Sequence, residues 1–138
     1  MNQIEENIKK HQLEAHKNKV WQEYSKWREN PVYCPALKEK VNFTLRGWKH
    51  TVGEDKKRTI DDIQVRLRMM SKVREIIEKS NFMQDVESFD GKIRYSFIAV
   101  EMLKEESGSA YTKLFVIVEK DSYGNLTFLS VFRRRPRL

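Results

Sequence analysis

The sequence predicts an α+β domain in which a long N-terminal helix and a second helix pack on an antiparallel sheet of about four strands. Residues 2 to 29 contain neither Pro nor Gly and are dense in Glu, Lys, Gln and Ala, which favours a helix. Apolar residues recur at helical spacing between positions 60 and 77, and positions 92 to 133 hold three runs rich in Ile, Val, Phe and Tyr. Helices first and strands later along one chain are typical of this fold class.

The composition agrees with one folded domain. With 138 residues, 39% of them hydrophobic, the chain can form one core and has no Pro-, Gly- or Ser-rich linker to divide it. We assign residues 1–30 to a helix that is partly extended from the body, and residues 31–138 to a single domain with a basic tail. Cys34 has no cysteine partner, and with three scattered His residues it does not suggest a zinc site. We expect no metal, no cofactor, no membrane span and a cytoplasmic location.

The first helix is expected to end at Asn30-Pro31, because proline ends a helix. Its apolar residues are sparse at first, with Ile4 and Ile8 one turn apart, and become concentrated near its end. Only the second half is therefore expected to dock on the core. The helix could alternatively serve self-association or partner binding, through a face formed by Val20, Trp21, Tyr24 and Trp27.

Two elements are predicted between this helix and the sheet. Val41–Arg46 alternates apolar and polar residues and stops at Gly47, which predicts a short first strand. Thr59 followed three residues later by Asp62 predicts an N-cap with negative charge in the first turn of a second helix, which runs to about Lys79. One apolar stripe of that helix is expected to face the core: Ile60, Ile63, Leu67, Met70, Val73 and Ile77.

Three strands in a meander complete the predicted fold. They cover Lys92–Leu103, Tyr111–Lys120 and Leu126–Arg133, which are rich in β-branched and aromatic residues. Turns are expected before the first strand at Asp90-Gly91 and between the strands at residues 107–109 and 123–125, where Gly is present each time.

His50 is the first candidate for chemistry. It follows the predicted first strand in the segment Arg46-Gly47-Trp48-Lys49-His50, and a histidine can take or give a proton near neutral pH. RNA cleavage needs a base for the 2'-hydroxyl, an acid for the leaving oxygen and cations for the charge on phosphate. His50, Arg46 and Lys49 have this chemistry. Alternatively, His50 only hydrogen-bonds a backbone carbonyl while Trp48 packs on the core.

The end of the last predicted strand carries further candidates. Alternation places Ser130 on the same face as Phe128 and Phe132, puts Arg133 on the opposite face, and returns Arg134 to the face of Ser130. Ser130 could position a phosphate, or it could be an ordinary strand serine. The tail is expected either to bind nucleic-acid phosphates or to be solvated, and its arginines are Arg133, Arg134, Arg135 and Arg137.

A third basic group, Lys56-Lys57-Arg58, precedes the second helix, whose backbone N–H groups also favour anions at that end. This predicts a phosphate site with Arg58, closest to the helix, as its main contact. The alternative is a charged loop, because nearby acidic residues partly cancel the local charge.

The net charge of +7 favours a polyanionic partner, which we expect to be RNA, with DNA as the alternative. The chain has no Gly-rich phosphate loop, no HExxH, no GxSxG and no acidic run arranged for two magnesium ions. These absences disfavour nucleotide-driven motors, zinc proteases and two-metal nucleases.

A pattern of segments spans about three quarters of the chain. It runs from Val32-Tyr33-Cys34-Pro35 through Val41-Asn42-Phe43-Thr44 to His50, continues with a helix that carries basic residues, and ends in a hairpin between Phe115 and Phe132. In this order it resembles the phage- and mobile-element-associated nuclease-like domains of the barnase, EndoU, colicin and RelE superfamily.

The resemblance implies helices on one face of an antiparallel sheet, whose open face holds RNA for metal-independent cleavage to a cyclic phosphate. It also implies that His50 matches the family's histidine and Ser130 its hydroxyl residue in the final strand, with Arg46 and Arg133 as looser matches. A second histidine and a catalytic carboxylate are not identified, so the acid partner is unassigned.

We therefore expect an endoribonuclease-like domain of mobile-element origin. The alternatives are a nucleic-acid-binding module without catalysis and a protein-interaction domain. Whether an inhibitor protein accompanies the chain stays open.

Overall fold

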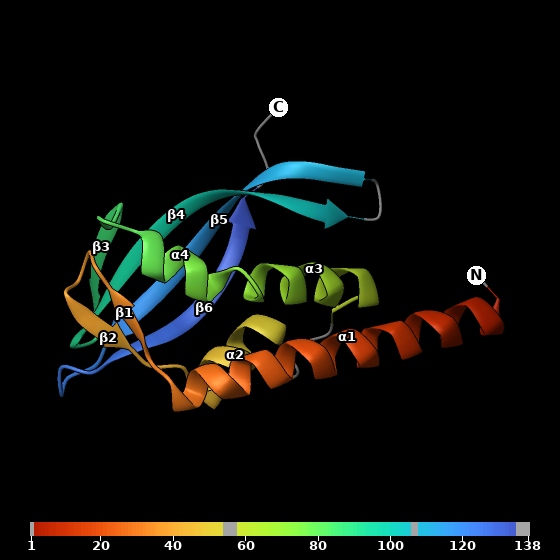
Figure 1. The fold of residues 1–138 in the computed structure, drawn as a ribbon, viewed down its shortest axis with the longest axis horizontal. Coiled ribbons are helices and arrows are strands. Elements are labelled where there is room, and N and C mark those ends of the chain that lie inside the picture. The colour runs from red at the N-terminus through yellow and green to blue at the C-terminus, as the bar shows by residue number, and fades with distance from the viewer. Residues whose placement is uncertain (1, 54–57, 106–107, 135–138) are drawn as a thin grey trace.

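The computed structural model describes residues 2–53, 58–105 and 108–134. It is an α+β fold, as the sequence predicts, with four helices, a four-stranded antiparallel sheet and a separate two-stranded sheet in this part of the chain. Figure 1 shows the larger sheet curling over the helices, which gather on one side of it. None of the helices among these residues has the length and apolarity needed to span a bilayer.

Helix α1 spans Gln3–Glu29, so the prediction for residues 2 to 29 is confirmed. The side chain of Asn2 accepts a hydrogen bond from the N–H of Glu5, which caps the helix. The first half extends beyond the body of the molecule (Figure 1), and Ile4 there is 71% exposed. The second half buries Val20 and Tyr24 in the same core as the sheet residues.

The predicted strand Val41–Arg46 is wrong beyond its first residues. Strand β2, Glu39–Val41, pairs with β1, Val32–Cys34, and Asn42 adds one isolated bridge to Thr127. Thr44 then starts helix α2, Leu45–Val52, because its side chain accepts a hydrogen bond from the N–H of Gly47. His50 therefore lies in a helix rather than after a strand.

The second predicted helix is confirmed at both ends but is divided in two. Helix α3 spans Ile60–Met70, with the side chain of Thr59 accepting from the N–H of Asp62, and helix α4 spans Val73–Lys79. Between them the N–H of Lys72 bonds the carbonyl of Met69, a tighter turn than the α-helical one. The predicted apolar stripe is buried at Leu67, Met70, Val73 and Ile77 and half-buried at Ile60 and Ile63.

The larger sheet has the order β3-β4-β5-β6, a meander. The three predicted strands are confirmed as β4, Lys92–Glu105, β5, Gly108–Lys120, and β6, Leu126–Arg134, while β3, Asp85–Phe89, was not predicted. Asp90 and Gly91 form the predicted two-residue turn between β3 and β4, both with positive φ. Of the next predicted turn, residues 107–109, residue 107 lies outside the described residues, and residues 108 and 109 already belong to β5.

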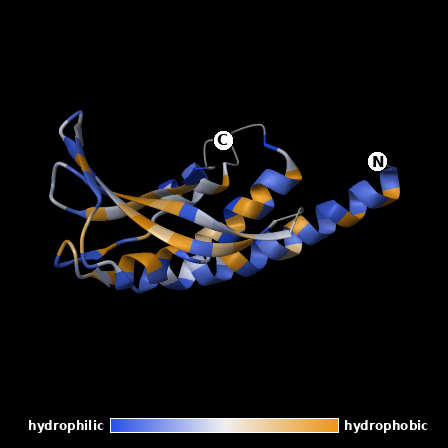
Figure 2. Ribbon diagram, turned by 90° about the horizontal axis from the view of Figure 1, so that it is seen from above, coloured by the Kyte–Doolittle hydropathy of each residue, from blue (hydrophilic) through white to orange (hydrophobic). Residues whose placement is uncertain are grey.

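The two faces of the sheet differ. Leu114, Val116 and Val118 of β5 are buried on the face that packs on the helices, and the residues between them are more exposed. Figure 2 shows the same alternation of apolar and polar residues along the strands. We call the other side the open face; by register it carries Arg94, Ser96, Ile98 and Val100 of β4, Lys113, Phe115, Ile117 and Glu119 of β5, and Ser130, Phe132 and Arg134 of β6.

A β-bulge in the last strand changes which of its residues share a face of the sheet. Ile117 pairs with Ser130, but the next residue of β5, Val118, pairs with Phe128, so Leu129 is an extra residue in β6. Phe128 is consequently buried in the core, whereas Ser130 and Phe132 share the open face. The prediction that Ser130 lies on the face of Phe128 is wrong for this reason.

Candidate functional site

Helix α2 lies along the outer edge of β6 and brings its side chains to the rim of the open face. A Cβ atom on Gly47 would lie 2.5 Å from the carbonyl oxygen of Phe128, so only glycine allows this approach. One turn later, Oγ1 of Thr51 accepts a hydrogen bond of 3.2 Å from the N–H of Val131. The hydroxyl of Tyr24 donates to the carbonyl of Thr44 and so holds the start of α2. The helix thus covers part of an edge strand.

Three cations surround one buried carboxylate on the open face. Glu119 is only 2% exposed, and its Oε1 atom lies 2.8 Å from Nη1 of Arg46 in α2. Its Oε2 atom lies 3.1 Å from Nε of Arg94, and Nζ of Lys92 is 3.8 Å from Oε1. We call these four residues the Glu119 cluster. It joins α2, β4 and β5, which are far apart in the sequence.

The cluster is a positively charged site. Burial alone would raise the pKa of Glu119, but hydrogen bonds from Arg46 and Arg94 outweigh this and hold the pKa below its usual range. Glu119 is therefore a carboxylate at neutral pH, and three cations against one anion leave a net charge of +2. The cations remain partly open to solvent, with side-chain exposures of 54% for Arg46, 40% for Lys92 and 33% for Arg94. A further anion could approach them.

Two aromatic rings stack in the middle of the open face. Phe115 and Phe132 are partners across β5 and β6, with ring centroids 5.2 Å apart and planes within 4° of parallel. Both side chains are half-buried. The guanidinium carbon of Arg134 lies 4.9 Å from the centroid of Phe115, in cation–π contact.

The structure brings some of the predicted site residues toward each other. Arg46 and His50 are one helical turn apart, so they project from the same side of α2. His50 and Ser130 lie in neighbouring elements, because Thr51, the residue after His50, accepts a hydrogen bond from the N–H of Val131, the residue after Ser130. Lys49 and His50 are both exposed.

The C-terminal arginines are split between two faces. Arg134 joins the aromatic pair on the open face. Arg133 pairs with Leu114 and is half-buried on the helix-covered side. Arg135 lies outside the described residues.

Arg58 has a different environment from the one predicted. Its side chain is 11% exposed, Nη1 donates to the carbonyl of Thr51 at 2.7 Å, and Nε lies 3.8 Å from Asp62. Arg66 donates to the same carbonyl. Arg58 is therefore engaged at the junction of α2 and α3, and we do not include it in the site. Lys56 and Lys57 lie outside the described residues.

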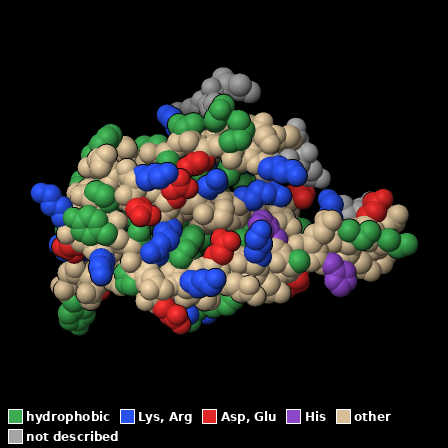
Figure 3. Space-filling view, viewed as in Figure 1, with side chains coloured by type: hydrophobic (Ala, Val, Ile, Leu, Met, Phe, Trp, Pro, Cys, Tyr) green, Lys and Arg blue, Asp and Glu red, His purple; other side chains and the backbone are tan. Residues whose placement is uncertain are grey.

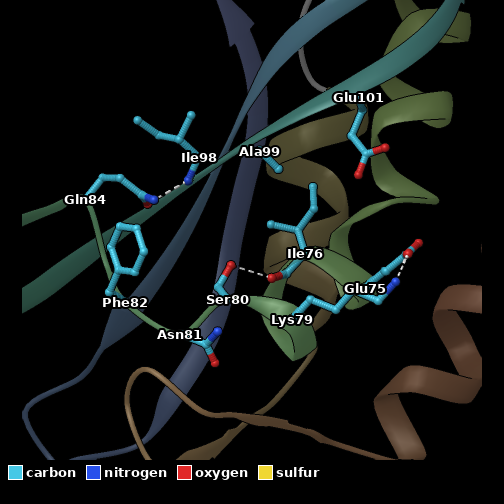
Figure 4. Close-up of a pocket in the computed structure, with 10 residues that line it drawn as sticks. All are labelled: Glu75, Ile76, Lys79, Ser80, Asn81, Phe82, Gln84, Ile98, Ala99 and Glu101. Carbon is cyan, nitrogen blue, oxygen red and sulfur yellow. Dashed lines mark hydrogen bonds and ion pairs between the residues drawn. The ribbon is translucent and has the colours of Figure 1, made fainter.

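A groove of about 290 Å³ lies beside β4, between the end of α4 and the start of β3 (Figure 4). There Oε1 of Gln84 accepts a hydrogen bond from the N–H of Ile98. This side chain thus pairs with the backbone of β4 just before β3 begins. The charged residues that line the groove are Glu75, Lys79 and Glu101, and Lys79 already pairs with Glu75 at 2.6 Å. Two acids against one base do not favour an anionic ligand, in contrast to the Glu119 cluster.

The sequence analysis missed Glu119, Lys92, Arg94 and Phe115. Glu119 could have been found, because alternation places it on the same face as Phe115 and Ile117 near the end of an apolar run, and a Glu enclosed in a sheet needs cationic partners. Which cations it meets depends on the register of β4 with β5 and on α2, which local sequence does not encode.

Basic side chains are not confined to the open face. Figure 3 shows Lys and Arg side chains mixed with acidic ones on the helix-covered side. Within the described ranges, no group of three or more His, Cys, Asp or Glu side chains is placed to hold a metal ion. Comparison of the chain with family models, curated proteins and solved structures gives no match.

Proposed function

We propose that this protein binds nucleic acid, with RNA the expected form, on the open face of its sheet. The observation that carries the proposal is the Glu119 cluster, where Arg46, Lys92 and Arg94 are gathered around one carboxylate. Glu119 holds the two guanidinium groups in fixed positions, so less side-chain entropy is lost when they contact phosphate. The net charge of +7 adds a long-range attraction.

The test is a titration of a labelled RNA, followed by fluorescence anisotropy, with wild type, Arg46→Gln and Arg94→Gln. Each variant should bind more weakly and should lower the slope of log affinity against log salt by about 1, the effect of losing one phosphate contact. Circular dichroism checks that all three proteins are folded. The same titration with DNA of the same sequence tests the choice of RNA.

Lys10→Gln is the matched control. Lys10 is also a cation in an ion pair, 3.8 Å from Glu6, but it lies on the extended half of α1 and is 59% exposed. Lys10→Gln lowers the net charge by the same amount as Arg46→Gln or Arg94→Gln does, but it should leave the affinity for RNA nearly unchanged. An equal loss of affinity in all three variants would mean that only the overall charge matters, which would contradict a site on the open face.

Metal-independent cleavage of the bound RNA is a second candidate function, in line with the family resemblance. The specific observation is that Glu119 supplies a carboxylate beside Arg46, with His50 one turn away on the same helix. A base, an acid and a cation are the groups that 2'-hydroxyl attack requires. We rank it second because Glu119 is 2% exposed and both of its oxygens already have cationic partners.

Cleavage is tested by incubating labelled RNA in EDTA with wild type, His50→Ala and Glu119→Gln, and by examining the product ends for cyclic phosphate. A catalytic site requires cleavage by wild type that both variants lose while they still bind RNA. Glu119→Gln removes the only negative charge of the cluster but keeps an amide oxygen that can accept from a guanidinium, so the variant should still bind RNA whether or not wild type cleaves. RNA that stays intact with wild type would leave binding as the function.

A further inference from the structure

The aromatic pair on the open face lies between two cationic positions. Along β5 the residues on this face are Lys113, Phe115, Ile117 and Glu119. At a rise of about 3.3 Å per residue, Lys113 lies roughly 7 Å from Phe115 on one side, and Glu119 lies roughly 13 Å away on the other. Lys113 pairs across the sheet with Arg134, so both ends of this strip carry positive charge.

The rings are also suitably exposed. Phe115 and Phe132 are held parallel by their cross-strand pairing, yet each is only half-buried, so part of each ring faces solvent. Arg134 already stacks on Phe115, and a guanidinium can stack on a nucleobase in the same way. A stacked pair with a cation at its side is a surface that accepts another flat, polarisable ring.

We propose that Phe115 and Phe132 stack with the bases of single-stranded RNA, whose backbone runs along β5 and β6 from the Glu119 cluster to Lys113 and Arg134. This inference rests on the proposed binding function and specifies its ligand. A duplex keeps its bases stacked and paired inside the helix, so it could use the cations but not the rings. The protein should therefore prefer single strands.

Charge favours a nucleic acid over a protein segment on this strip. The acidic residues Asp85 and Glu87 lie on β3, at the far side of the sheet from β6. On the described part of β5 and β6, Glu119 is the only acidic residue facing this side, and its charge is exceeded by that of its partners. An apolar protein partner would gain little from cations at both ends of the aromatic pair.

The experiment compares one labelled RNA as a single strand and annealed to its complement, with wild type, Phe115→Leu and Phe132→Leu. Leucine keeps an apolar side chain but removes the ring, so each variant should bind the single strand roughly 5- to 100-fold more weakly, the range measured for loss of one stacked base. Duplex affinity should not change. Phe132→Tyr keeps the ring and should keep the wild-type affinity for the single strand.

Phe82→Leu is the matched control, because Phe82 is 66% exposed but lines the groove beside β4 rather than the open face. It should bind both forms as wild type does. Single-strand affinity that survives in both ring variants, while Arg94→Gln weakens binding, would overturn the stacking inference alone. If wild type binds neither form of RNA, the proposed function fails and the stacking inference fails with it.

Discussion

At the residue scale, Glu119 determines where the positive charge of the open face is concentrated. A lone carboxylate buried in a sheet would be costly, and this one is stabilised because each oxygen has a guanidinium partner. The same contacts lower the pKa of Glu119 relative to the unfolded chain. A group with a depressed folded-state pKa stabilises the fold above its unfolded pKa of about 4.3, and this contribution is lost as the pH falls through the folded-state value.

We therefore expect Glu119→Gln to lower the free energy of unfolding at pH 7 by about 1 to 3 kcal/mol, in the range for a buried hydrogen-bonded group whose partners can turn toward water. The difference between variant and wild type should narrow as the pH falls below about 4.3, because the unfolded wild-type chain then takes up a proton at Glu119 before the folded protein does. Urea unfolding at a series of pH values measures it. Glu87→Gln, at an exposed position of β3, is the control and should leave the free energy of unfolding nearly unchanged. If the difference in stability between Glu119→Gln and wild type did not depend on pH, the lowered pKa of Glu119 would be contradicted.

Gly47 is a second residue whose role was not apparent in the sequence, where it appeared to end a strand. It lies inside α2, and an added Cβ would lie 2.5 Å from the carbonyl oxygen of Phe128 and 2.9 Å from the hydroxyl oxygen of Tyr24. Only the packing of α2 on β6 shows why glycine is required there.

Gly47→Ala should destabilise the protein. Alanine is better than glycine in a helix by about 1 kcal/mol, but overpacking costs about 1 to 3 kcal/mol. A contact of 2.5 Å with a backbone oxygen belongs at the upper end of that range, so the net loss should be about 2 kcal/mol. Chemical denaturation measures the change. Asn18→Ala, on an exposed position of α1, should show no loss; a stabilised Gly47→Ala variant would mean that α2 can move away from β6.

At the element scale, long periodic segments were predictable and short ones were not. Helix α1 and strands β4, β5 and β6 were found within a few residues of their ends, because each repeats its pattern over nine residues or more. Strands β1 and β2 have three residues each, and β3 has five, too few for periodicity to distinguish them from loops. The segment after Val41 has strand-like composition, but the Thr44 cap and the burial of Phe43 and Trp48 make it the start of a helix.

The contact between α2 and the edge of β6 gives a prediction for these two elements. Thr51 is fully buried, and its Oγ1 accepts from the N–H of Val131, which no neighbouring strand pairs. Thr51→Val keeps the shape but leaves that N–H without an acceptor, which should cost about 1 to 3 kcal/mol. The amide of Val131 should also exchange faster with solvent, as NMR hydrogen exchange would show. Thr112→Val on β5 is the control, and equal stability of both variants would contradict the role of Thr51.

At the scale of the whole molecule, one core joins elements from both halves of the chain, including Val20 and Tyr24 of α1. The sequence predicted this docking of the second half of α1, and it predicted the sheet that carries the site. It could not predict the site itself, because α2, β4, β5 and β6 meet only through their tertiary contacts. The extended half of α1 contributes little to this core.

Removal of residues 2–12 should therefore leave both stability and RNA binding nearly unchanged. The segment carries two Lys and two Glu, so the net charge of +7 does not change. Its contacts with the rest of the protein include the ion pair of Lys9 with Asp61, at 3.9 Å and partly exposed, which contributes less than about 1 kcal/mol. Ile4 and Ile8, 71% and 52% exposed, lie one turn apart on this segment and form its apolar surface.

Self-association is the property that the truncation should change. We expect the shortened chain to sediment as a monomer at concentrations where the full chain associates, with the same affinity for RNA. The full chain with Ile4→Gln and Ile8→Gln together should behave like the truncated one, because it removes the apolar surface and keeps the helix. If the truncated chain lost RNA affinity while remaining folded, the binding surface would have to include α1, and a site confined to the open face of the sheet would be wrong.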